Sequence, residues 1–256
     1  MTDKTHKTPH RGIYLLPNLF TTAALFCGFY AIVSSINGRF ETAAIAIFVA
    51  MVLDGVDGRV ARLTNTESDF GAEYDSLADM VSFGLAPALI IYLWSLSNLG
   101  KIGWLVSFVY VACAALRLAR FNTQASHSDK RYFQGLASPA AAAVVAGLIW
   151  NGGLIKEYVS APTLQYIALA ATLFAGLLMV SNVRYHSFKG VNWRSKVPFF
   201  TILMFVFALV FVSAEPALVL FAIFLGYALS GPILTIILLR RRRAERELLK
   251  QQDKTD

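Results

Sequence analysis

Long apolar runs separated by short polar segments dominate this chain from residue 15 onward. Most runs approach the roughly 20 mainly apolar residues that cross the ~30 Å hydrocarbon core of a bilayer. They lack the alternation of apolar and polar positions typical of membrane-barrel strands, so each is predicted as a helix, which satisfies its own backbone hydrogen bonds. The pattern predicts an all-α integral membrane fold with about eight transmembrane helices: Leu15–Ile36, Thr42–Val60, Ser76–Leu96, Ile102–Leu118, Ala137–Leu154, Leu164–Val180, Pro198–Val212 and Pro216–Leu239.

The composition excludes a single soluble domain. Hydrophobic residues make up 56% of the chain and charged residues 15%, whereas soluble domains carry about 25% charged residues. The net charge of +7 is therefore attributed to orientation in the membrane and to contact with anionic membrane lipids, and no nucleic acid partner is expected.

Basic residues are divided unequally between the two sets of connecting segments. One set holds Arg39, Lys101 and Lys156, and the other set holds the remaining 20 of the 23 lysines and arginines, including the run Arg240–Arg243. Because basic residues concentrate in cytoplasmic loops, both termini are predicted to be cytoplasmic, which agrees with an even number of spans.

No internal repeat or low-complexity linker divides the chain, so we expect one membrane domain. The predicted boundaries are a cytoplasmic N-terminal segment over 1–13, a transmembrane domain that carries the chemistry over 14–240, and a basic cytoplasmic tail over 241–256. The first twelve residues are polar and basic, and the apolar run that follows is longer than the core of a signal peptide.

Four carboxylates lie at the predicted cytoplasmic ends of two consecutive helices. Asp54 and Asp57 share a helix face at spacing i,i+3, and Asp75 and Asp79 share a face at i,i+4. A helical hairpin would bring the two faces together. Acidic residues at membrane depth are costly, and they indicate a functional site.

Four close carboxylates repel one another unless cations neutralise them. Hard divalent cations such as Mg²⁺ or Mn²⁺ prefer oxygen ligands, and two such ions form a recurring clamp in phosphoryl chemistry. The alternative is that the aspartates pair with arginines at the membrane interface, such as Arg59 and Arg62. Four aspartates with glycines at fixed offsets favour the metal site.

Small residues accompany the aspartates. Gly58 and Ala61 lie on the Asp54 face, and Gly71 lies one turn before Asp75. They leave room for a large polar group to approach the metals. Arg62 closes the same face and is able to hold a phosphate through two hydrogen bonds.

The string Asp54-x2-Asp57-Gly58-x2-Ala61-Arg62-x8-Gly71-x3-Asp75-x3-Asp79 resembles the complete signature of the CDP-alcohol phosphatidyltransferase family. Every fixed position is filled. The resemblance implies a helical membrane fold, usually a homodimer, and two divalent ions held by the four aspartates, with the last aspartate as general base. It also implies that the small residues and the arginine of the signature surround the cytidine and diphosphate of CDP-diacylglycerol. The two predicted spans beyond the family's usual six have no assigned role.

The signature indicates the donor but not the alcohol that accepts the phosphatidyl group. Four further stretches resemble the phosphatidylserine synthase branch of the family, which implies L-serine as acceptor and a bacterial inner membrane: Pro17–Thr21, Ser76–Gly84, Leu116–Thr123 and Tyr132–Pro139. One departure is Ala137, where the branch has proline in Gly-Leu-x-Ser-Pro. A helix start at Pro139 tolerates that change.

Three polar residues near the end of the fourth predicted span are candidates for binding the acceptor. Arg117 and Arg120 are three residues apart and suit a carboxylate, and Asn122 offers further hydrogen bonds. The alternatives are ordinary anchoring of both arginines at the headgroups and a turn at Asn122.

Two other functions stay open at this stage. One is the same transfer to glycerol 3-phosphate, an inositol phosphate or choline. A phosphate-bearing acceptor would need a denser basic pocket, and choline would need an aromatic cage, to which Phe121, Tyr132 and Phe133 could contribute. The other is a divalent-cation transporter, whose site would lie near the midplane between repeated, broken helices. The aspartates lie at helix ends instead.

Overall fold

The computed structural model describes residues 15–64, 66, 68–124, 132–186, 210–211 and 213–252. The described chain is almost entirely helical. Its helices are α1 Leu15–Ile36, α2 Phe40–Thr64, α3 Asp69–Asp79, the π-helical turn η2 Met80–Leu85, α4 Ala86–Trp94, the 3-10 helix η3 Leu96–Leu99, α5 Lys101–Gln124, α6 Ser138–Trp150, α7 Gly152–Tyr158, α8 Ala161–Val180 and α10 Pro216–Gln252. Two three-residue strands, β1 Tyr132–Gln134 and β2 Arg184–His186, complete it.

Several helices are long and apolar enough to cross a membrane, so the chain is a multi-pass membrane protein. Within the described residues five stretches qualify, and the bent pair α6 and α7, which meet at 56°, would make a sixth. They are Leu16–Ile36, Asp69–Trp94, Lys101–Thr123, Ala161–Val180 and Pro216–Ile237. The predicted number of eight is not confirmed.

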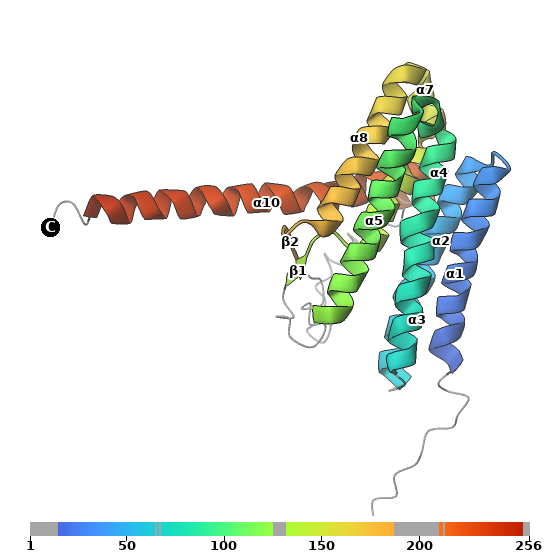
Figure 1. Cartoon of the computed structure of the whole chain (residues 1–256), viewed down its shortest axis with the longest axis horizontal. Coiled ribbons are helices and arrows are strands. Elements are labelled where there is room, and N and C mark those ends of the chain that lie inside the picture. The colour runs from blue at the N-terminus through green and yellow to red at the C-terminus, as the bar shows by residue number, and fades with distance from the viewer. Residues whose placement is uncertain are drawn as a thin grey trace, which may run out of the picture.

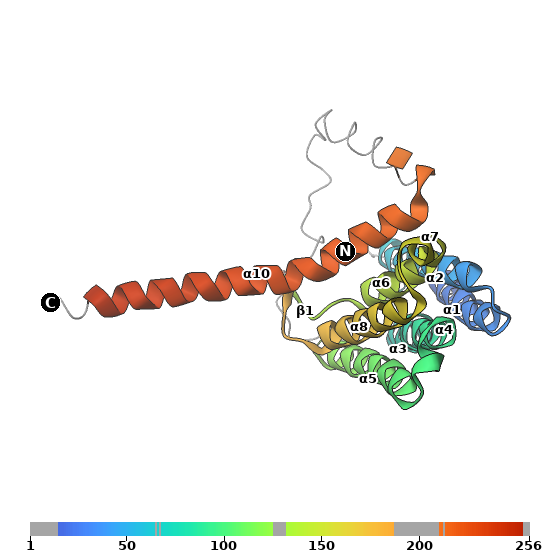
Figure 2. The same cartoon turned by 90° about the horizontal axis from the view of Figure 1, so that it is seen from above.

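Two predicted spans explain the difference. Charged residues interrupt the apolar sequence of α2, so it does not qualify by composition, although it is 25 residues long and packs along α1 (Figures 1 and 2). The predicted span Pro198–Val212 lies outside the described residues, except for residues 210–211.

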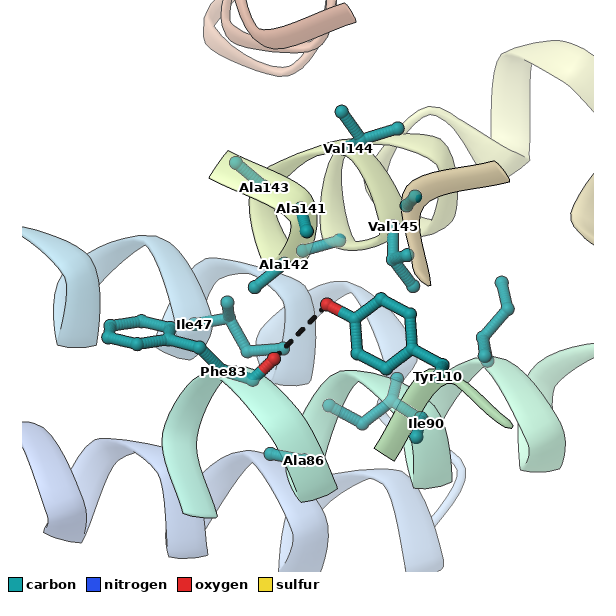
Figure 3. Close-up of a cluster of buried hydrophobic side chains, with 14 of the residues drawn as sticks. Ile47, Phe83, Ala86, Ile90, Tyr110, Ala141, Ala142, Ala143, Val144 and Val145 are labelled. Carbon is teal, nitrogen blue, oxygen red and sulfur yellow. Dashed lines mark hydrogen bonds between the residues drawn. The ribbon is translucent and has the colours of Figure 1, made fainter. Parts of the chain in front are cut away.

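Helix α6 forms the centre of the bundle. Eleven of its 13 residues are buried, most of them alanine and valine, because α2, α4, α8 and α10 all pack against it. Figure 3 shows Ala141, Ala142 and Val145 of this helix facing Ile47 of α2 and the ring of Tyr110 of α5. Small side chains let these helices approach closely, as is typical of helix packing in membranes.

The two ends of the bundle differ. The end that carries the four aspartates, here called the aspartate end, includes α3 and the start of α1; the opposite end includes α7 (Figure 1). Helix α10 begins at the opposite end, where Asn151 Nδ2 donates a hydrogen bond of 2.8 Å to the carbonyl oxygen of Ala217. It then packs against α6 at Gly147, where a Cβ atom would lie 2.8 Å from Phe221 Cδ2.

Helix α10 continues without a break beyond the bundle as far as Gln252 (Figures 1 and 2). The predicted basic tail over 241–256 therefore begins as part of a helix that starts within the bundle. The proposed domain boundary at residue 240 stays a prediction.

The all-α prediction is confirmed, and two short strands accompany the helices. They pair antiparallel, with Phe133 opposite Tyr185. Gly135 follows with a positive φ of 80°, which favours glycine, and its N–H donates to the carbonyl oxygen of Val183 at 2.9 Å. The N–H of Leu136 donates to the carbonyl oxygen of Leu178, also at 2.9 Å. This strip joins the end of α8 to the start of α6.

Candidate active site

Three of the four predicted aspartates gather around one point. Asp54 and Asp57 of α2 and Asp75 of α3 each offer a carboxylate oxygen, and these oxygens lie within 4.8 Å of one another. Asp79 lies beside them, because its side chain and that of Asp54 are in hydrogen-bonding contact. Carboxylates this close repel one another when ionised unless a proton or a cation lies between them.

Local helix geometry explains how the aspartates meet. On α2 the two residues stand about one turn apart, and on α3 they stand four residues apart, so each pair shares a face. The start of α3 is fixed by Ser68, whose Oγ accepts a hydrogen bond of 3.1 Å from the N–H of Gly71. The segment between the two helices is short, and both helices pack against α1, which brings their aspartates within reach of one another.

The site suits a divalent cation. Asp75 Oδ1 is buried and has no hydrogen-bond partner among the described residues. Leaving a buried acceptor unpaired costs about 1–3 kcal/mol, and a cation would satisfy it. Carboxylate oxygens are also the ligands that Mg²⁺ and Mn²⁺ prefer. The donor set and the unpaired oxygen both fit the metal predicted from the sequence.

Helix α1 supports the cluster through a residue that sequence reasoning missed. Thr21 is buried, and its hydroxyl donates a hydrogen bond of 2.7 Å to Asp57 Oδ2. Beside it, the hydroxyls of Thr22 and Tyr74 lie 2.9 Å apart and connect α1 to α3. Thr21 belongs to Pro17–Thr21, one of the four stretches that carry the family resemblance. This membership was the available sequence signal for Thr21. Such outer contacts orient metal-binding carboxylates.

A π-helical turn directly follows Asp79. The sequence predicted one continuous helix over Ser76–Leu96, whereas η2 inserts a wider turn between α3 and α4. The phenol of Tyr110 donates to the carbonyl oxygen of Phe83 in this turn at 3.1 Å (Figure 3), and Ser82 Oγ donates to the carbonyl oxygen of Ala24 at 3.1 Å. Turns of this kind are frequent at functional sites.

The residues predicted to bind the donor follow the aspartates on α2 and precede them on α3. A Cβ atom added to Gly58 would have no described atom within 4 Å, so packing within the chain does not require a glycine there. Arg62 is exposed, and its Nε donates to the carbonyl oxygen of Gly58 at 2.8 Å. Ala61 is half-buried. A Cβ atom at Gly71 would lie 3.2 Å from Ser68 Oγ. This face of α2 is open to a ligand.

The three residues predicted to bind the acceptor lie in different surroundings. Arg117 interacts electrostatically with the aspartates, because the charges of Asp79 and Asp54 favour its protonated form. Its Nη1 donates to Ser138 Oγ at 2.8 Å, and its buried Nε has no hydrogen-bond partner among the described residues. Arg117 therefore has hydrogen-bonding capacity left for a ligand.

Arg120 and Asn122 form hydrogen bonds with neighbouring helices. Arg120 Nη2 donates to the carbonyl oxygen of Val180 at 2.9 Å, at the end of α8. Asn122 Nδ2 donates to Ser76 Oγ at 3.1 Å and connects α5 to α3. Of the three residues, Arg117 interacts electrostatically with the carboxylates, and the other two lie at helix–helix contacts.

Comparison with known proteins gives a consistent result. The sequence model of the CDP-alcohol phosphatidyltransferase family matches residues 14–178. A protein of Helicobacter pylori strain J99, named CDP-diacylglycerol–serine O-phosphatidyltransferase, is 42% identical over 232 residues, which cover 90% of this chain and 95% of the relative. A protein of Bacillus subtilis strain 168 with the same name is 34% identical over 174 residues, which cover 68% of this chain and 91% of the relative.

Proposed function

Because the chain belongs to the CDP-alcohol phosphatidyltransferase family, we propose that it transfers the phosphatidyl group of CDP-diacylglycerol to L-serine, giving phosphatidylserine and CMP. The observation that carries this proposal is the cluster of Asp54, Asp57 and Asp75, with Asp79 in contact with Asp54 and with Arg117 interacting electrostatically with Asp54 and Asp79. It combines an anionic site for metals, a carboxylate near the reacting atoms and a cation for the acceptor. The names of the relatives support the choice of serine.

The donor side of the site would be formed by α2 and α3. The four aspartates would hold two divalent ions, Mg²⁺ or Mn²⁺, which when bound neutralise the diphosphate of the donor. Gly58, Ala61 and Gly71 keep side-chain bulk away from the nucleotide. The Arg62 guanidinium, anchored through Nε at the exposed end of α2, offers its terminal nitrogens to a phosphate.

Asp79 would act as the general base. It takes the proton of the serine hydroxyl while the serine oxygen forms a bond to the phosphorus that carries diacylglycerol. The bond from this phosphorus to the bridging oxygen breaks, and CMP leaves with the electron pair. Holding donor and acceptor in line supplies most of the acceleration in reactions of this type.

Arg117 would bind the serine carboxylate. Ser138 Oγ accepts from its Nη1 and anchors the guanidinium, and the buried, unpaired Nε keeps a hydrogen for the acceptor. The acceptor-binding roles predicted for Arg120 and Asn122 stay predictions. Their contacts in the structure hold α8 and α3 in place around Arg117.

The family resemblance and the charge distribution support three further features. We propose that the protein lies in a bacterial inner membrane with both termini in the cytoplasm, that α2 also crosses the membrane, and that the chain works as a homodimer. The aspartate end would then face the cytoplasm, where CTP-derived donors and serine are present.

The test is CMP release by the purified protein with CDP-diacylglycerol and Mn²⁺, with L-serine, glycerol 3-phosphate, an inositol phosphate and choline supplied separately. Release is expected with serine alone, with phosphatidylserine as product, and not after chelation of the metal. Release with a different alcohol would overturn serine as acceptor and keep the donor site. No release with any alcohol would overturn the transferase, and transport of the cation would then be measured in proteoliposomes.

A further inference from the structure

A cavity of about 900 Å³ lies at the end of the bundle opposite the aspartates, and the proposed reaction does not use it (Figure 1). Its walls come from the start of α2, the end of α4, the bend between α6 and α7, and the start of α10. One candidate membrane span ends at Trp94 and another begins at Pro216, and both residues line the cavity. The cavity therefore lies at the level where spans reach the bilayer surface and where lipid headgroups are found.

Charged side chains of both signs line this cavity. Among the described residues, two are basic and three are acidic: Arg39, Lys156, Glu41, Glu157 and Glu215. All five are exposed, which leaves them accessible to a ligand. A cavity with both signs suits a zwitterion, because a purely anionic ligand would meet the carboxylates and a purely cationic ligand would meet the basic groups.

A buried hydrogen-bond acceptor without a partner belongs to the same wall. Asn151 lines the cavity and is 3% exposed. Its Nδ2 donates to the carbonyl oxygens of Gly147 and Ala217, each at 2.8 Å, so both amide hydrogens are used. Its Oδ1 has no hydrogen-bond partner among the described residues. The side chain can therefore offer only this oxygen to a ligand, and a ligand with an N–H group would satisfy it.

An apolar pocket of about 230 Å³ adjoins the charged cavity, since Asn151 and Leu154 line both. The rest of its wall consists of Ile155, Tyr158, Val159, Leu218 and Phe221. A charged space at headgroup level that continues into an apolar space matches the two parts of a phospholipid. The two indole rings in the wall of the charged cavity, Trp94 and Trp150, fit the same level, because tryptophan is enriched where headgroups meet acyl chains.

We propose that this cavity binds a zwitterionic phospholipid whose headgroup ends in a primary ammonium, with part of one acyl chain in the apolar pocket. The phosphate pairs with Arg39 and Lys156, and the ammonium pairs with the carboxylates and with Asn151 Oδ1. A quaternary ammonium has no N–H to donate, so it would leave the Asn151 oxygen without a partner. The proposal does not depend on the transfer reaction, because none of these residues belongs to the aspartate end.

The test is native mass spectrometry of the delipidated full-length protein in detergent, titrated with three lipids that share the same oleoyl chains. Phosphatidylethanolamine carries a primary ammonium, phosphatidylcholine a quaternary ammonium, and phosphatidylglycerol no ammonium. Phosphatidylethanolamine is expected to bind about tenfold more tightly than the other two lipids, as is typical for hydrogen bonds to a charged group. Equal affinities for phosphatidylethanolamine and phosphatidylcholine, or tighter binding of phosphatidylglycerol, would overturn the proposal.

Variants of the lining residues show whether this preference belongs to the cavity. With Glu41, Glu157 and Glu215 replaced together by glutamine, the preference for phosphatidylethanolamine over phosphatidylcholine is expected to fall to about twofold or less. Arg39→Gln removes a partner of the phosphate, so it should weaken binding of both zwitterionic lipids roughly tenfold. Lys101→Gln is the matched control, since this exposed residue at the start of α5 does not line the cavity.

The binding measurement needs no enzymatic activity, so it stands apart from the test of the proposed function. Because all the substituted side chains are exposed, each lipid-free variant is expected to keep the melting temperature of the wild-type protein. An undiminished preference for phosphatidylethanolamine in the glutamine variant would place the bound lipid elsewhere and reject the inference. Arg39→Gln that binds both lipids as Lys101→Gln does would reject it as well.

Discussion

The carboxylates of the site differ in their surroundings, and these differences indicate different roles. Asp57 is 5% exposed and accepts a hydrogen bond from the Thr21 hydroxyl, so the orientation of its carboxylate is set before any ligand binds. Asp75 has a buried oxygen without a partner among the described residues, which indicates a ligand position. Asp79 is in contact with Asp54 and interacts electrostatically with Arg117, which suits the proposed role as general base.

The base role of Asp79 predicts that Asp79→Asn abolishes turnover. Asparagine has nearly the same size but cannot take the proton, and a general base contributes roughly 10²–10⁴-fold to a rate. CMP release is expected to fall by at least this factor, while CDP-diacylglycerol binding, measured by equilibrium binding in detergent, is retained. Asp69→Asn, at the exposed start of the same helix, is the control and keeps its rate. A wild-type rate in Asp79→Asn would exclude Asp79 as the base.

The Thr21 contact predicts a defect in metal affinity. Thr21→Val preserves the shape of the side chain and removes the hydroxyl that donates to Asp57. Loss of an outer-shell partner typically weakens metal binding about 10- to 100-fold. The Mn²⁺ concentration for half-maximal CMP release is therefore expected to increase by this range, with the maximal rate largely recovered at saturating Mn²⁺. The exposed Thr163→Val should not change it, and an identical Mn²⁺ curve for Thr21→Val would contradict the proposed role.

These residues are positioned by helices. The helices approach one another closely because small side chains lie at their contacts. Gly28 of α1 faces the π-helical turn η2, and a Cβ atom there would lie 2.5 Å from Ser82 Oγ and 2.7 Å from Ser82 Cα. The Ser82 hydroxyl bridges the two segments through the carbonyl oxygen of Ala24. The distance between α1 and the turn after Asp79 is thus set at this contact, about two helical turns from Thr21.

We therefore expect Gly28→Ala to separate α1 from η2. The backbone of Ser82 cannot move aside without moving the turn, so overpacking should cost about 1–3 kcal/mol. The melting temperature of the detergent-solubilised protein should fall, and CMP release should fall with it because Thr21 moves away from Asp57. The matched control is Gly226→Ala on α10, where no described atom lies within 4 Å and alanine should be neutral or slightly stabilising. Equal melting temperatures for the two variants would contradict this account.

The apolar pattern predicted where helices occur better than how they bend. The ends of α1 and the end of α8 agree with the predicted spans, because continuous apolar sequence defines them. The bend between α6 and α7 occurs at Asn151, before Gly152, where a Cβ atom would lie 2.5 Å from the Trp94 ring. That contact joins residues far apart in sequence, so no local pattern reveals it. The same holds for η2, whose freed Phe83 carbonyl depends on Tyr110 of another helix.

The sequence predicted the chemistry of the candidate site but not all of the residues that form it. The aspartates were recognisable because charge in an apolar chain is costly and the spacing is regular. Thr21 and Ser138 carry no charge, and threonine and serine occur throughout membrane helices. Their roles depend on which helices pack together, and this is set by the bundle around α6 and by the β1–β2 strip.

The two ends of the whole molecule differ in their charged residues. Arg39 and Lys156 line a cavity of about 900 Å³ together with Glu41, Glu157 and Glu215. This cavity lies near the start of α10, at the end of the bundle opposite the aspartates. Two of the three basic residues that the sequence assigned to the non-cytoplasmic side thus meet at one place. The charge bias of the sequence and the arrangement of the helices support the same orientation.

This orientation predicts which residues a membrane-impermeant maleimide reaches. With Cys27 and Cys113 replaced by alanine, Glu157→Cys places one exposed thiol at the α7 end, and Asp69→Cys places one at the aspartate end. In intact spheroplasts Glu157→Cys should react and Asp69→Cys should not; in inverted vesicles the pattern should reverse. Each variant is first required to release CMP like its cysteine-free parent, so that labelling reports on folded protein. Labelling of Asp69→Cys from outside would place the aspartates away from the cytoplasm, where a nucleotide-linked lipid would not reach them, and would contradict both the orientation and the proposed reaction.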